Sequence, residues 1–197
     1  MSKKPNNPRK LSVKSQEYKS QIEIATQTLE RNIGFINNCD NKTSIVLAVV
    51  GVLLTIILTS DALKKIYEII KTCIAQKTCC CILYLIFLFF SVGIMLYGIL
   101  CLGSVLIAKT AEATRDFSNK NSHIFFEGIK MSGSYQVFHN EFVSLSPQDL
   151  LEELTTQIYI NADIASAKYS KYNRGLKWSV GGFALFVTML IVGVCLY

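Results

Sequence analysis

The side chains that could carry acid–base chemistry are few and widely spaced in this sequence. Its two histidines, His123 and His139, stand sixteen residues apart, and neither neighbours an aspartate. Glu152 and Glu153 follow a predicted helix start, where acidic residues stabilise the helix dipole. The signatures of serine hydrolases, P-loop enzymes, dinucleotide-binding folds and zinc proteases do not occur. We therefore expect a protein that is not an enzyme and has no catalytic residue.

Seven cysteines are the other candidates for a site, and three of them are consecutive, from Cys79 to Cys81. Neighbouring residues of a helix point about 100° apart, so three in a row cannot enclose one metal ion. The sequence also lacks a Cys-x-x-Cys pair, which argues against zinc. We interpret the three cysteines as small apolar residues at a helix entrance, with acylation or an external disulfide as alternatives. No metal ligand is predicted.

Three long runs without charge or histidine must position whatever site exists. They cover residues 44–60, 79–108 and 178–197. Apolar runs of about 18 residues or more are typical of transmembrane helices, because lipid offers backbone polar groups no partner. The predicted fold class is an all-α membrane protein, with three transmembrane helices whose long helical cytoplasmic extensions form a bundle. The alternative is a soluble protein with buried core helices, but a chain of 197 residues is too short to enclose them.

Lysines and arginines predict the orientation in the membrane. Segments 1–43 and 109–175 hold eight and seven of them, whereas the segment 61–78 holds four. Basic residues favour the cytoplasmic side. We therefore place the N-terminus and a sensing region, 109–177, in the cytoplasm, and 61–78 as an external loop. The opposite orientation stays open, because that loop is itself rich in lysine.

The formal net charge of the chain is +6. A basic tail beside an anionic membrane surface accounts for it. The long segment 109–175 is nearly balanced in charge, and no basic groove for DNA or RNA stands out. Membrane lipid is therefore an expected partner, and nucleic acid is not.

The polar N-terminal part divides into two. Residues 1–10 are basic, contain two prolines and predict a disordered tail. Residues 11–43 predict a cytoplasmic amphipathic helix, either continuous with the first span or broken at Asn37-Asn38. Its apolar stripe consists of Tyr18, Ile22, Ala25, Leu29, Ile33 and Ile36.

The clearest helix start lies at Ser146 and Pro147, a capping residue followed by proline at the first helical position. We predict nearly one helix from there to residue 197. Its first half carries an apolar stripe at heptad-like spacing. That stripe consists of Leu151, Leu154, Ile158, Ala162, Ala165, Tyr169 and Tyr172. A continuation of the second span to about Phe117 would add a third helix to the cytoplasmic bundle.

Between residues 119 and 145 the helical period is lost. A short apolar cluster ends at Gly128, and Tyr135 to His139 predict a short helix or strand. Irregular segments at the tip of a rigid bundle are common places for ligand sites.

Three blocks resemble the membrane effectors of the Pycsar antiphage systems. In the first, an aromatic residue, Asp40 and Lys42 lead into the first span. The second is the string Ser122-His123-Ile124-Phe125-Phe126-Glu127-Gly128, in which Glu127 departs from the family's pattern. The third begins at Gln157-Ile158-Tyr159 and continues through Ala162 and Lys168-Tyr169 into the last span. Order and spacing agree over nearly the whole chain from Leu11.

The resemblance implies a multi-pass protein of the bacterial inner membrane with a cytoplasmic N-terminus. Such an effector would sense cCMP, cUMP or a cyclic oligonucleotide during phage infection. It would then impair the membrane and cause growth arrest or cell death. The genetic partner would be a nucleotide cyclase, and linked binding events favour a homo-oligomer. A scaffold or accessory subunit that no messenger gates, and a small channel, are the alternative functions.

A cyclic nucleotide offers a flat base and an anionic phosphate. Phe125 or Phe126 would stack on the base. Basic groups would meet the phosphate, with snorkelling at span ends as their alternative role. The candidate phosphate contacts are Lys42, His123, Lys168 and Arg174. The full set of candidate ligand-binding residues is Asp40, Lys42, Ser122, His123, Phe125, Phe126, Gly128, Gln157, Lys168 and Arg174. Asp40 and Lys42 could instead pair with each other or with lipid headgroups.

Overall fold

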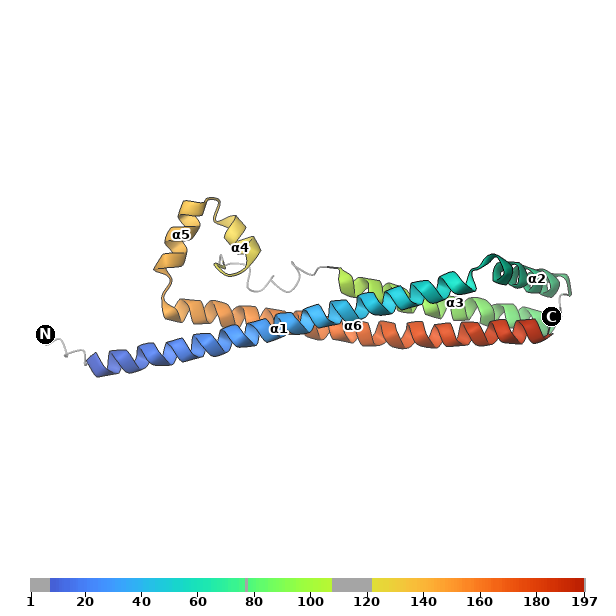
Figure 1. Cartoon of the computed structure of the whole chain (residues 1–197), viewed down its shortest axis with the longest axis horizontal. Helices are drawn as coiled ribbons and strands as arrows, with labels where there is room; N and C mark the ends of the chain where they lie inside the picture. The colour runs from blue at the N-terminus through green and yellow to red at the C-terminus, as the bar shows by residue number, and fades with distance from the viewer. Residues whose placement is uncertain (1–7, 77, 108–121, 197) are drawn as a thin grey trace. The chain divides into compact units, whose positions relative to one another are not determined.

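The structure is a computed structural model that describes residues 8–76, 78–107 and 122–196. All regular structure in these ranges is helical. Three of the helices are long and apolar enough to cross a membrane, which confirms the predicted fold class. The helices are α1 (Pro8–Ile57), α2 (Ser60–Gln76), α3 (Cys79–Leu106), α4 (Phe126–Met131), α5 (Tyr135–Ser144) and α6 (Pro147–Leu196) (Figure 1). The candidate spans lie in α1, α3 and α6.

The chain folds as two units. The first consists of Met1–Asn37 and Lys109–Ser166, and the second of Asn38–Ala108 and Ala167–Tyr197. Helices α1 and α6 are each a single helix of 50 residues, and each contributes residues to both units. The alternative of a break at Asn37-Asn38 is therefore wrong.

Helix α1 begins at Pro8, inside the segment 1–10 that the sequence predicts to be disordered. Proline is favoured at the first position of a helix, because its missing N–H is not needed there. Residues 8–10 are thus helical, and residues 1–7 lie outside the described part of the chain.

One face of α1 is covered along most of its length. The covered positions alternate steps of four and three residues, the spacing of coiled-coil packing. Ile33, predicted to belong to this stripe, is exposed instead, and Asn32 takes its place. The covered positions are Tyr18, Ile22, Ala25, Leu29, Asn32, Ile36, Cys39, Thr43, Val46 and Val50.

Helix α6 starts as predicted. The Ser146 hydroxyl accepts a hydrogen bond from the Asp149 N–H at 3.2 Å and donates to the Asp149 carboxylate at 2.6 Å. The prediction that Ala162 faces the bundle is wrong, because Ala162 is exposed. At about 100° per residue, α6 turns the arc of Leu154, Gln157 and Ile160 inward, and Ala162 falls outside that arc.

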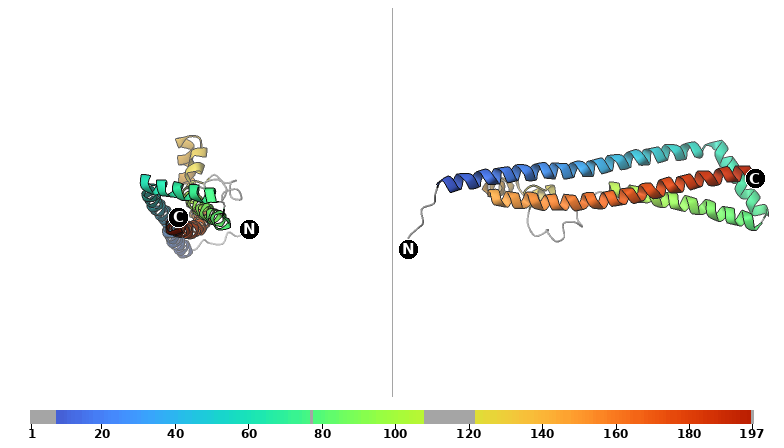
Figure 2. Two further views of the ribbon diagram at one scale, coloured as in Figure 1. Left: turned by 90° about the vertical axis from the view of Figure 1, so that its right-hand side faces the viewer. Right: turned by 90° about the horizontal axis from the view of Figure 1, so that it is seen from below.

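In the second unit, α6 lies between α1 and α3 (Figure 2). Helices α3 and α6 run antiparallel and approach closely through small residues. A Cβ atom added at Gly98 would lie 2.6 Å from the Ser179 Cα, and one at Gly182 would lie 2.7 Å from the Met95 Cα. The Tyr84 hydroxyl donates to the Met189 carbonyl at 3.0 Å. Close backbone approach of this kind stabilises helix pairs in lipid, where burial alone provides little driving force.

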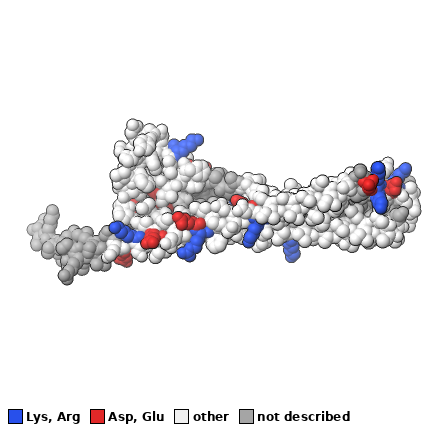
Figure 3. Space-filling model, viewed as in Figure 1, with Lys and Arg blue, Asp and Glu red and all other residues white. Residues whose placement is uncertain are grey.

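The segment 61–78, expected as a loop, is largely the helix α2. Its apolar residues recur every three or four positions, and Ile69 and Cys73 are buried. These two side chains join a cluster with Tyr84 and Leu88 of α3 and Phe186 of α6. Charged side chains gather over α2 (Figure 3).

The sequence left two further points open on the polar segments. Residues 135–139, predicted as helix or strand, belong to α5 and are helical. Helix α3 ends at Leu106 and Ile107 is extended, so the helix does not continue there, and the remainder of the predicted continuation, residues 108–117, lies outside the described residues.

Candidate functional site

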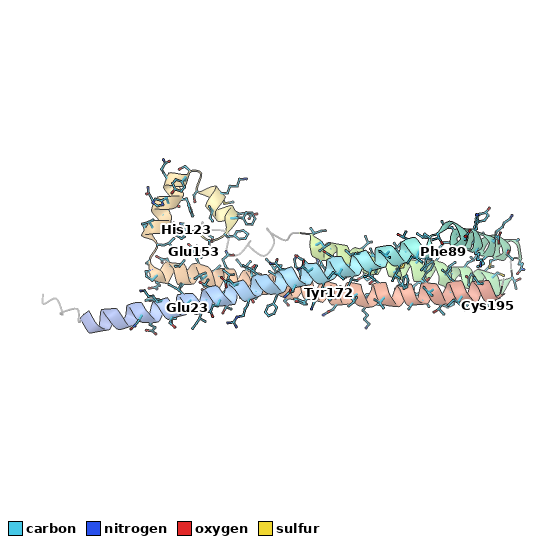
Figure 4. The ribbon with its side chains drawn as sticks, in the orientation of Figure 1. Glu23, Phe89, His123, Glu153, Tyr172 and Cys195 are labelled. Atoms are coloured by element: carbon cyan, nitrogen blue, oxygen red, sulfur yellow. The ribbon has the colours of Figure 1, made fainter. Side chains whose placement is uncertain are left out.

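His123 fastens the segment that precedes α4 to the side of α6. Its ring atom Nδ1 lies 2.6 Å from Oε1 of Glu153, and its backbone N–H donates to Oε2 of Glu153 at 2.8 Å. Because a carboxylate accepts and does not donate, Nδ1 carries the proton. Both side chains are about four-fifths buried, with exposures of 18% and 19%. Figure 4 shows the two residues meeting from the two segments.

Ser122 holds the same segment in a tight turn. Its hydroxyl accepts hydrogen bonds from the N–H groups of Ile124 at 3.3 Å and Phe125 at 3.2 Å, and donates to Glu153 at 3.4 Å. Gly128 lies against the backbone of Ser122. A Cβ added at position 128 would lie 2.7 Å from the Ser122 N and even closer to its carbonyl oxygen, so only glycine fits there. Serine at 122 and glycine at 128 thus follow from the geometry of one compact turn.

The other ring nitrogen of His123 faces α5. Nε2 lies 3.6 Å from Oε2 of Glu141, beyond hydrogen-bonding distance. Within the described residues this buried oxygen has no hydrogen-bond partner. His123 therefore stands between two carboxylates, and in this arrangement its ring positions the turn.

Aromatic faces are available beside this turn. The rings of Phe125 and Phe126 are tilted, with centroids 4.6 Å apart, and Phe126 is 59% exposed. On α5 the exposed rings of Tyr135 and His139 stack with centroids 5.7 Å apart. An exposed aromatic face can stack on any nucleobase.

A second group of candidates lies in the second unit. Lys168 of α6 is buried, and its Nζ donates to both carboxylate oxygens of Asp40 on α1. Asp40 thus pairs with Lys168, so the alternative of a pair between Asp40 and Lys42 is wrong. Lys42 and Arg174 are exposed.

The structure therefore brings some of the predicted residues together and keeps others in separate groups. Ser122, His123, Phe125, Phe126 and Gly128 share one turn in the first unit, where Gln157 is buried on α6. Asp40, Lys42, Lys168 and Arg174 belong to the second unit.

The two carboxylates beside His123, Glu153 and Glu141, were not predicted from the sequence as site residues. Glu153 is the seventh residue of α6, past the first turn, where a role in the helix dipole is weak. This position beyond the first turn was the signal in the sequence that Glu153 has another role. Among the residues described, no group of three or more metal-binding side chains comes together.

The apolar helices and the polar helical region define a helical membrane protein. Residues 24–195 match the model of the Pycsar effector protein domain. The Pycsar effector protein GmPycTM of Gulbenkiania mobilis is 31% identical over 182 residues, which cover 85% of this chain and 90% of that protein. No solved structure matches the chain.

The chain therefore belongs to the Pycsar transmembrane effector family, a family of antiphage defence effectors. This confirms the resemblance carried by the three sequence blocks. The family is one of membrane effectors, and membership implies activation by a cyclic nucleotide in general terms.

Proposed function

We propose that this protein is a receptor for a cyclic nucleotide in the bacterial inner membrane, and that the bound messenger makes it impair that membrane. Growth arrest or death of the infected cell follows. One observation carries the proposal: the turn that resembles the family's second block is fastened to Glu153 of α6. The same helix contains the third candidate span. A change at the turn thus acts directly on a membrane helix.

The messenger binds, in this proposal, at the turn formed by residues 122–128. Phe126 is the exposed ring for the base. The anionic phosphate competes with Glu153 for the ring and backbone N–H groups of His123, since both are oxygen acceptors. Exchange of one acceptor for the other releases the turn from α6. Lys42 and Arg174 are exposed in the second unit, and their role as phosphate contacts stays a prediction from the sequence.

Gating also sets an energetic requirement. A ligand shifts a conformational equilibrium only by its difference in affinity for the two states. Converting a silent population into a dominant one takes about 5.5 kcal/mol. Several subunits that bind together supply this more easily than one, so we propose a homo-oligomer. Exposed apolar side chains on α4 and α5 offer a surface for it: Ile129, Met131, Tyr135, Val137, Phe142 and Val143.

We further propose that both long polar segments face the cytoplasm, where a nucleotide cyclase makes the messenger. The segments 1–43 and 109–175 hold fifteen of the basic residues, against four in 61–78. The candidate messengers are cCMP, cUMP and cyclic oligonucleotides.

The test is the membrane potential of cells that express this chain together with a matching cyclase. We expect depolarisation when the messenger accumulates, and none with an inactive cyclase. Glu153→Gln weakens the hydrogen bonds between Glu153 and His123 of the turn. It should therefore lower the messenger concentration that is needed for depolarisation. Asp163→Asn, an exposed change on the same helix, should behave like the native protein. An unchanged potential, with protein and messenger both confirmed, would overturn the proposal.

A further inference from the structure

Helix α2 is amphipathic, but only half of its apolar face is used inside the protein. Ile69 and Cys73 are 6% and 1% exposed and pack into the cluster with α3 and α6. The other half contains Leu63, Tyr67 and Ile74, which are 46%, 67% and 58% exposed. The second half therefore points away from the core and is left uncovered by the described residues.

The exposed side chains form one continuous strip. At about 100° per residue, Leu63, Ile74 and Tyr67 fall within an arc of roughly 40°. Lys71 and Lys64 follow directly beside that arc, within roughly 60° more. An apolar strip edged by lysines is the pattern of a helix in a lipid–water interface, where lysine stems cover apolar surface and their ammonium groups reach phosphate.

The position of α2 in the chain points to the same surroundings. It begins after α1 ends at Ile57, and it ends before α3 begins at Cys79. Both neighbours are candidate membrane spans. The two ends of α2 are therefore tied to the same face of the bilayer, and α2 cannot cross it.

The direction of α2 agrees with that position. Viewed along the long axis, α2 lies across the other helices of the second unit (Figure 2, left). A helix that crosses transmembrane helices at their ends runs along the membrane surface. Its net charge also suits an anionic surface, with Lys64, Lys65 and Lys71 against Asp61 and Glu68.

We propose that α2 is an interfacial helix whose Leu63–Tyr67–Ile74 strip inserts into the boundary between headgroups and acyl chains, with Lys64 and Lys71 at the lipid phosphates. The partner is bilayer lipid. Ile69 and Cys73, in the other half of the apolar face, hold the same helix on α3 and α6. A shift of these spans therefore moves α2 in one leaflet of the bilayer. This inference holds for either orientation and does not depend on the messenger.

The test uses tryptophan fluorescence at two neighbouring positions. Trp178, the single tryptophan of the chain, is changed to phenylalanine. Tyr67→Trp then reports on the strip, and Glu68→Trp on the polar face. Each protein is reconstituted into vesicles of phosphatidylcholine and phosphatidylglycerol, with and without brominated acyl chains. We expect bluer emission and about twofold stronger quenching by bromine at position 67 than at position 68.

Equal emission and equal quenching at the two positions would overturn the inference. So would stronger access of the water-soluble quencher acrylamide at position 67 than at position 68. If the Trp178→Phe protein fails to fold, the same two substitutions are made with Trp178 in place, and the signal of the parent protein is subtracted.

Discussion

Lys168 of α6 lies 2.6 Å from Oδ1 and 2.8 Å from Oδ2 of Asp40 on α1, and its side chain is only 7% exposed. A buried ammonium group is costly unless a carboxylate pairs with it. The pair therefore ties two helices of the second unit together shortly before the apolar runs begin at residues 44 and 178.

Asp40→Asn should destabilise the protein, because it leaves the buried Lys168 ammonium without a counter-charge. Loss of one partner of a buried pair costs about 3–5 kcal/mol, and less here since Asp40 is one-third exposed. Thermal unfolding in detergent measures this effect. The double variant Asp40→Asn with Lys168→Met should recover part of the lost stability, because it also removes the buried ammonium group.

The matched control is the exposed pair of Lys64 and Asp61, whose atoms lie 3.9 Å apart. Lys64→Met should leave the midpoint of unfolding unchanged, because exposed pairs contribute little. Equal effects of Asp40→Asn and Lys64→Met on the midpoint would contradict the role assigned to the buried pair. So would a double variant of Asp40 and Lys168 whose loss of stability equals the sum of the two single losses.

Gly98→Ala should destabilise the pair of helices α3 and α6. The added methyl group would clash with the backbone of Ser179, and the clash is relieved only if the two helices move apart. Overpacking of this kind costs about 1–3 kcal/mol. Gly93→Ala is the control, since an added Cβ there has no described atom within 4 Å. Thermal stability of the two variants in the same detergent gives the comparison, and a Gly98→Ala protein as stable as the control would refute the close approach.

Glu153→Ala should release the turn from α6. It leaves the N–H groups of His123 without their acceptor, at a cost of about 1–3 kcal/mol. Amide hydrogen exchange should quicken at Ile124 and Phe125, which lie in the turn. Asp163→Ala should leave exchange there unchanged. Protection that survives the loss of Glu153 would show that other contacts hold the turn.

The Cys39 thiol should resist alkylation. Burial, with the neighbouring charge of Asp40, raises the pKa of this thiol. Because the thiolate is the reactive form, a raised pKa leaves Cys39 with less thiolate at neutral pH than an ordinary thiol has, and its labelling should quicken at a higher pH than that of an exposed thiol. Asn41→Cys, at an exposed position on the same helix, is the control. Maleimide labelling of single-cysteine variants measures both rates, and equal rates at neutral pH would contradict the burial of Cys39.

The long elements could be predicted because their signals are local. Freedom from charge over 79–108 and 178–197 indicates spans, and Ser146 with Pro147 indicates where α6 starts. The helical nature of α2 was also visible in its apolar spacing, but its lysines were interpreted only as a signal of topology.

The site depends on contacts between distant parts of the chain. His123 and Glu153 are 30 residues apart, and Asp40 and Lys168 are 128 apart. No local pattern says which carboxylate a given base will meet. The exposure of Ala162 has a similar cause, because α1 and the turn together decide which arc of α6 is covered.

Release of dye from vesicles tests the central claim most directly. The purified protein is reconstituted into vesicles loaded with a self-quenching dye, and cCMP, cUMP and cyclic oligonucleotides are added one at a time. One of these nucleotides should release the dye at concentrations where calorimetry detects its binding, and protein-free vesicles should stay intact. Dye that stays inside with every nucleotide, or that escapes equally without any, would contradict gating by a cyclic nucleotide.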